Sequence, residues 1–160
     1  MAEPQGTAKA IVIDTNVVLD LFVFDDPAAG VLRDALGSGQ LAWLATAAMR
    51  DELARVLAYP QIARRLAHRA LAVDAVLAQF DRGARVVETA ARAPFVCKDA
   101  DDQKFIDLAV AHRALLLSKD AAVLCMRRRL ATLGVTLSAA WGAPRHDPML
   151  RNAAASRAPD

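Results

Sequence analysis

The chain has 160 residues, a length that fits one domain with a substantial core. Hydrophobic residues make up 55% of it, but acidic residues interrupt the longest apolar stretch, and no window reaches the ~18 uncharged residues that a transmembrane helix needs. Glu3 and Pro4 stand where a signal peptide would place a basic region and an apolar core. The net charge of +2 favours no class of partner. We therefore expect a cytoplasmic protein that does not enter a membrane.

Short apolar runs alternate along the chain with segments of helical periodicity, and turn-forming residues such as Gly37 and Pro60 separate them. The expected strands are residues 10–14, 41–45, 85–88, 115–118 and 135–137. The expected helices are residues 16–24, 28–36, 46–58, one or two within 61–82, 102–113, and one that opens at Asp120 and ends at Gly134. This alternation predicts an α/β fold in which a mainly parallel sheet of about five strands carries helices on both faces.

The composition also predicts where the folded part begins and ends. Residues 1–9 form an N-terminal extension, residues 10–138 form the domain, and residues 139–160 are rich in Pro, Ala and Arg without periodicity. We expect this last segment to be a loosely ordered tail.

Four acidic residues occupy comparable places in the predicted fold. Asp14 ends the first strand, Glu52 lies on the helix after the second, Asp102 opens a helix, and Asp120 follows the fourth strand. If the first and fourth strands are neighbours, three of these side chains converge at the sheet edge where α/β proteins place their ligand sites. Clustered carboxylates stay ionised only when a cation offsets their repulsion. Ligation by oxygen alone favours Mg²⁺ or Mn²⁺ over zinc.

Helix capping is an alternative explanation for the three aspartates, because each precedes a predicted helix and Asp is a preferred N-cap. Glu52 could likewise pair with Arg55 or face water. A cap requires neither an apolar strand before it nor other acids in register, so the four positions together favour a site.

Other reactive side chains point to no second chemistry. His112 is expected on the inward side of its helix, and Cys97 precedes the acidic loop; we assign both to core packing or to a supporting role. Cys97 and Cys125 are expected to be free thiols. The sequence offers no serine or cysteine triad and no glycine-rich phosphate loop.

Four segments, in this order and spacing, resemble the PIN-domain family over about residues 10–138. They are Ile11–Leu19, Glu52–Leu57, Cys97–Phe105 and Leu117–Asp120. The third segment is most similar to the branch of toxins from toxin–antitoxin systems. Two features depart from the family: Ala121-Ala122 stands where relatives often carry another acid, and the Arg-rich tail has no counterpart.

The resemblance implies a three-layer α/β/α sandwich and a VapC-like, metal-dependent endoribonuclease that acts on single-stranded RNA. It implies that Mg²⁺ or Mn²⁺ is held by Asp14, Glu52, Asp102 and Asp120. Supporting roles, orienting these ligands or the attacking water, fall to Asn16, Ser118, Asp99 and Asp101. It also implies a homodimer and an antitoxin partner that masks the cleft.

Two further hypotheses compete with a nuclease. The chain could be a catalytically inactive nucleic-acid- or partner-binding module that keeps its acids as helix caps and binds through its basic face. A phosphatase with Asp14 as nucleophile is disfavoured, because Asn16 stands where such enzymes need a second aspartate.

Overall fold

The computed structural model describes residues 8–142, and a five-stranded parallel sheet runs through its centre. The strand order is β3-β2-β1-β4-β5, so β1 is central and pairs with β4 on one side and β2 on the other. The strands are β1 (Lys9–Ile13), β2 (Leu41–Ala45), β3 (Ala84–Val86), β4 (Leu115–Leu117) and β5 (Thr136–Ser138). The predicted number of strands and their parallel direction are confirmed.

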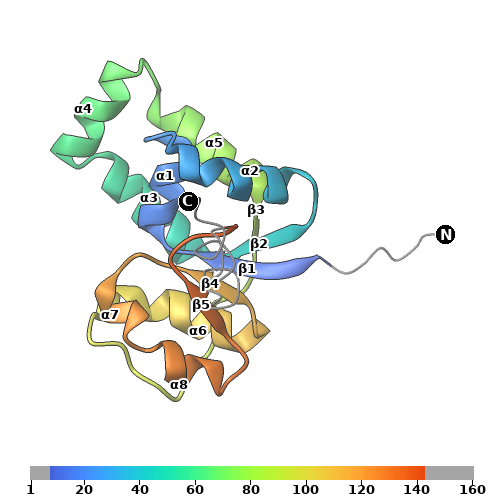
Figure 1. Cartoon of the computed structure of the whole chain (residues 1–160). Coiled ribbons are helices and arrows are strands. Elements are labelled where there is room, and N and C mark those ends of the chain that lie inside the picture. The colour runs from blue at the N-terminus through green and yellow to red at the C-terminus, as the bar shows by residue number, and fades with distance from the viewer. Residues whose placement is uncertain (1–7, 143–160) are drawn as a thin grey trace, which may run out of the picture.

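Helices cover both faces of this sheet, which gives the expected α/β/α sandwich (Figure 1). Helices α1 to α5 lie on one face, and α6, α7 and α8 lie on the other. The helices are α1 (Thr15–Phe22), α2 (Gly30–Gly37), α3 (Ala47–Leu57), α4 (Pro60–His68), α5 (Val73–Gly83), α6 (Gln103–His112), α7 (Ala121–Leu124) and α8 (Arg127–Ala131). Single 3₁₀ turns, η1 (Pro27–Ala29) and η2 (Ala100–Asp102), precede α2 and α6.

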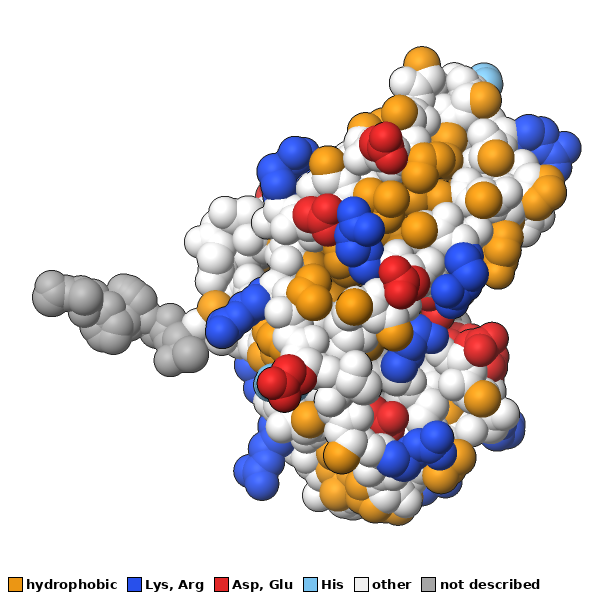
Figure 2. Space-filling model, turned by 180° about the vertical axis from the view of Figure 1, so that it is seen from behind, with side chains coloured by type: hydrophobic (Ala, Val, Ile, Leu, Met, Phe, Trp, Pro, Cys, Tyr) orange, Lys and Arg blue, Asp and Glu red, His pale blue; other side chains and the backbone are white. Residues whose placement is uncertain are grey.

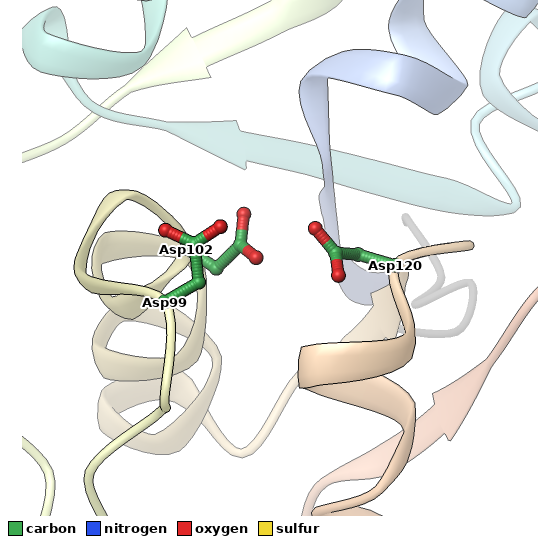
Figure 3. Close-up of side chains that lie close together, drawn as sticks. All are labelled: Asp99, Asp102 and Asp120. Carbon is green, nitrogen blue, oxygen red and sulfur yellow. The ribbon is translucent and has the colours of Figure 1, made fainter.

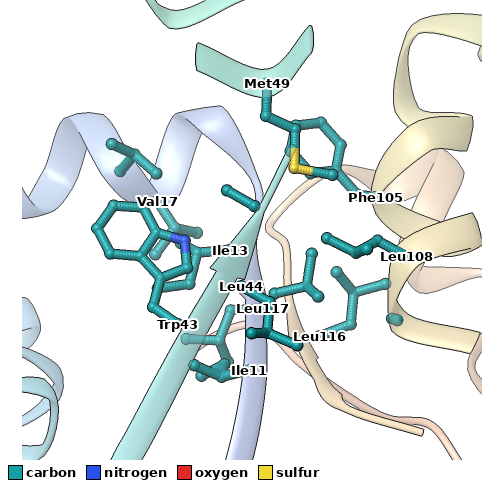
Figure 4. Packing of buried hydrophobic residues seen from close by; sticks show 14 of the residues in the cluster. Ile11, Ile13, Val17, Trp43, Leu44, Met49, Phe105, Leu108, Leu116 and Leu117 are labelled. Atoms are coloured by element: carbon teal, nitrogen blue, oxygen red, sulfur yellow. The ribbon is translucent and has the colours of Figure 1, made fainter. Parts of the chain in front are cut away.

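The core explains why this sequence makes a three-layer fold. A strand covered by helices on both sides has no polar face, and Ile11, Val12 and Ile13 are all buried. Met49 from α3 and Phe105 and Leu108 from α6 are all buried beside these strands (Figure 4). The inward faces predicted for both helices are confirmed.

Two local predictions were wrong. The helix expected after Asp120 is divided into α7 and α8, because the chain tightens into a turn in which the Met126 amide donates to the Val123 carbonyl. His112 is exposed and not inward. The helix ends at His112, and Arg113 adopts a left-handed conformation (φ 48°) that terminates the helix before β4.

The predicted tail lies outside the described residues from 143 onward. Just before it, Trp141 packs against the core. Within residues 8–142, no helix combines the length and apolar character that crossing a membrane would require.

Candidate metal centre

Asp14 lies at the carboxyl end of β1, where pairing of β1 with β4 continues through a 2.9 Å hydrogen bond from the Asp14 amide to the Leu117 carbonyl. Its carboxylate is 3% exposed. Oδ1 accepts the Asn16 amide at 3.3 Å, which caps α1, and Oδ2 accepts the Ser118 hydroxyl at 2.7 Å. Asn16 is exposed, and its backbone amide is the group that contacts Asp14; its predicted orienting role stays a prediction.

Ser118 connects Asp14 to Asp120 through hydrogen bonds. Its buried hydroxyl donates to Asp14 and accepts the Asp120 amide at 3.1 Å. Asp120 in turn caps α7, since its Oδ1 accepts the Ala122 amide at 2.9 Å. The Ser118 hydroxyl thus lies between these two acids, and its predicted orienting role stays a prediction.

Asp102 does not cap α6, contrary to the sequence-based prediction. The turn η2 precedes the helix and gives Asp102 a helical backbone (φ −90°, ψ −12°), so its carboxylate is not positioned over the first amides. The cap of this segment is Asp99, whose Oδ1 accepts the Asp101 amide at 2.9 Å. Capping therefore does not account for Asp102.

The carboxylate of Asp102 points instead toward those of Asp99 and Asp120. One oxygen from each of the three lies within 4.8 Å of the others, across the space between the start of α6 and the segment before α7 (Figure 3). Asp102 is buried, and its Oδ2 has no hydrogen-bond partner among the residues that the structure describes. Asp101 is exposed and lies outside this group.

The electrostatics of the cluster are unfavourable without a cation. Burial raises the pKa of Asp102 to about 8, and the nearby carboxyl of Asp120 and the charges of Asp14 and Asp99 act in the same direction. Burial also raises the pKa of Asp14, against the opposing hydrogen bond from Ser118. An oxygen-only donor set with a buried, unpartnered oxygen fits a hard divalent cation. The cluster could therefore hold a metal ion.

Glu52, the fourth predicted ligand, has other partners. Its Oε2 accepts the Thr15 hydroxyl at 2.7 Å, and its Oε1 forms an ion pair with Lys104. The charge of Glu52 still contributes to the raised pKa of Asp14, so it lies close to the acids. The structure thus brings carboxylate oxygens of Asp99, Asp102 and Asp120 together. Asp14 lies outside this group and acts on Asp102 through its charge, and Glu52 is engaged elsewhere.

Sequence reasoning missed the residues that hold the acidic loop in place. Gln103 is buried next to Asp102; its Oε1 accepts the Cys97 amide at 2.6 Å, and its Nε2 donates to Asp107 at 2.8 Å and to the Phe95 carbonyl at 3.1 Å. Cys97 itself is buried, and burial raises the pKa of its thiol, in accord with a packing role. A buried glutamine gives no periodic signal, so only its position beside the acids could have suggested it.

Comparison with known families agrees with this arrangement. A family model described as the PIN domain matches residues 10–122, a span that includes all of these acids. The chain belongs to the PIN-domain family, whose fold is that of a nuclease. A comparison with curated proteins gave no significant match.

The raised pKa of Asp102 predicts a pH dependence of stability. Between 3.8 and about 8 the folded protein retains a proton that the unfolded chain has lost, so the free energy of unfolding falls as the pH rises. In a chelating buffer, the melting temperature should fall from about pH 5 to about pH 8, and Asp102→Asn should weaken this fall. Asp101→Asn, its exposed neighbour, is the control. Equal pH slopes for wild type and Asp102→Asn would contradict the assignment.

Proposed function

We propose that this protein is a metal-dependent endoribonuclease that hydrolyses phosphodiester bonds in single-stranded RNA. The observation that carries the proposal is the buried oxygen of Asp102, which has no partner within residues 8–142 and lies among two other carboxylates. A helix cap or a solvated acidic surface would leave no such oxygen. Membership of the PIN-domain family supports a nuclease, and the acids supply ligands of the type that Mg²⁺ and Mn²⁺ prefer.

The roles of the side chains follow from their contacts. Asp102 and Asp120 would hold the cation, with Asp99 and Asp14 completing the negative surroundings. Ser118 keeps Asp14 and Asp120 in a fixed relation, so little reorganisation is needed when the cation binds. The bound cation would polarise a phosphate oxygen and lower the pKa of a water molecule at the site.

A basic stretch of the chain around α4 suits the RNA backbone. Residues 53–73 contain no acid but carry Arg55, Arg64, Arg65, His68 and Arg69. Most of these lie on α4, which projects on the same side of the molecule as the end of β1 (Figure 1). In Figure 2, basic side chains are seen at the outer end of this upper part and at several other places on the same face. Binding through such charges should be sensitive to salt.

The proposal predicts that Asp14→Asn and Asp102→Asn each lower the rate of RNA cleavage by at least about 100-fold, because each removes charge from the centre that stabilises the reacting phosphate. Cleavage of a labelled single-stranded RNA in Mg²⁺ or Mn²⁺ measures this. Asp34→Asn, an exposed change of the same kind on α2, should cut at the wild-type rate. Circular dichroism checks that each variant is folded. Cleavage by both site variants at the parent rate would refute the assignment.

A binding module without catalysis is the competing function, and metal binding separates the two. A metal centre predicts that Mn²⁺ raises the melting temperature of the wild type, since a ligand that binds the folded state stabilises it. The rise should vanish in Asp102→Asn and in Asp120→Asn, which remove the proposed ligands, and it should shrink in Asp14→Asn, which removes a neighbouring charge. A melting temperature that ignores Mn²⁺, with RNA binding intact, would favour the binding module.

We further propose that the nuclease is the toxin of a toxin–antitoxin pair in the cytoplasm. The support is the similarity of the Cys97–Phe105 segment to that branch of the family. An antitoxin would cover the acidic centre, and the family likeness suggests a homodimer. Hydrophobic side chains that gather on the upper half of the face in Figure 2 are suited to such contacts.

Induced expression tests the toxin proposal. Wild-type protein should arrest growth, and Asp14→Asn, produced at the same level, should relieve the arrest because it removes the activity and not the fold. Asp34→Asn should arrest growth like the wild type. Growth that continues at high levels of soluble, RNA-cleaving wild type would contradict a toxin role while leaving the nuclease assignment in place.

A further inference from the structure

Glu52 and Lys104 form an ion pair beside the acidic cluster, and the pair is only partly open to solvent. The Glu52 side chain is 19% exposed and that of Lys104 is 24% exposed. The pair joins α3 on one face of the sheet to the first turn of α6 on the other. Thr15 donates to the second Glu52 oxygen at 2.7 Å. Both carboxylate oxygens of Glu52 are therefore engaged by this protein's own side chains.

Lys104 is held at a defined place two residues beyond Asp102. Its ammonium donates to Glu52 and to the Asp101 carbonyl at 2.5 Å, and it lies 5.0 Å from the centre of the Phe105 ring. A lysine ammonium has three N–H donors. Two of them are accounted for by acceptors in the described part of the chain, which leaves one for a ligand.

The ammonium of Lys104 is directed away from the cluster. Its ion pair in the described residues is with Glu52, and its other acceptor is the Asp101 carbonyl, although Lys104 follows Asp102 in the same helical turn. If Glu52 turned toward a cation, it would leave the half-buried ammonium without its counter-ion, which costs free energy. A hydrated divalent cation needs only one or two carboxylates from the protein, and Asp102 and Asp120 already supply them.

We propose that Glu52 is not a metal ligand but a positioning residue for Lys104, and that Lys104 binds a non-bridging oxygen of the RNA phosphate next to the metal centre. The inference rests on the proposed nuclease function and assigns two residues within it. Its chemistry is that of a point charge held near a phosphate, as lysine commonly provides. Thr15 and the Asp101 carbonyl keep the pair from swinging into the cluster.

A titration with Mn²⁺ tests whether Glu52 is a metal ligand, and it does not depend on catalysis. Isothermal calorimetry should give Glu52→Gln an affinity within about threefold of the wild type, whereas Asp120→Asn should lose at least about tenfold. The melting temperature of Glu52→Gln should still rise with Mn²⁺. A loss in Glu52→Gln as large as that in Asp120→Asn would overturn the inference.

Kinetics with labelled single-stranded RNA test Lys104. Lys104→Met should lower kcat/KM by about 100-fold while Mn²⁺ affinity is kept, and Lys104→Arg should restore part of the loss. Lys9→Met is the matched control, because Lys9 begins β1 and so lies at the other end of the strands from the acids; this variant should leave kcat/KM unchanged. The variant Glu52→Gln/Lys104→Met should be no slower than Lys104→Met alone, because residues that act as a unit are not additive.

Losses that multiply in the double variant would overturn the coupling of the two residues, and a wild-type rate in Lys104→Met would overturn the phosphate contact. A wild type that binds Mn²⁺ but leaves RNA intact would remove the proposed function and the role of Lys104 with it. The Mn²⁺ titration would still decide whether Glu52 is a ligand, so failure of the nuclease function can be distinguished from failure of the role assigned to Glu52.

Discussion

The pairing of β1 with β4 at the centre of the sheet is the constraint on which the acidic centre depends. Their register, with Ile13 opposite Leu117, brings the residues after both strands to the same edge. Asp14 and Ser118 follow directly, and the hydrogen bond between them fixes the first carboxylate against the segment that leads to Asp120. Because helices bury both faces of these strands, neither segment can move away to relieve the repulsion of the acids.

Burial of these carboxyls, together with their mutual repulsion, is the physical reason for expecting a cation. The raised pKa values of Asp102 and Asp14 show that the fold holds these carboxyls where their charged forms are disfavoured. Buried carboxyls held close together do not stabilise the fold. Carboxyls with shifted pKa values are typical of functional sites. The contrast with Glu52, which has Lys104 as counter-ion, shows that the same small region contains both a compensated and an uncompensated acid.

Much of this could be predicted from the sequence, because the signals were periodic. The apolar run that ends at Asp14 predicted β1 and the position of Asp14 at the ligand-binding edge. The periodic apolar residues of α3 and α6 predicted which face of each helix is buried. The closeness of Asp102 to Asp120 was predicted, but the alternative that Asp102 caps α6 was wrong, because η2 is a single turn that no local pattern marks and it gives Asp102 a helical backbone. The partners of Glu52 were missed for a related reason, since Thr15 and Lys104 lie in distant segments and meet it only in the folded chain.

The most direct test of the account is a crystal structure of the protein soaked in Mn²⁺, with anomalous diffraction used to locate the ion. The account predicts a peak between Asp102 and Asp120, about 2.1 Å from an oxygen of each, with Glu52 still paired to Lys104. A peak coordinated by Glu52 would contradict the role assigned to that residue. The absence of any peak among Asp14, Asp99, Asp102 and Asp120 at saturating Mn²⁺ would contradict the metal centre itself.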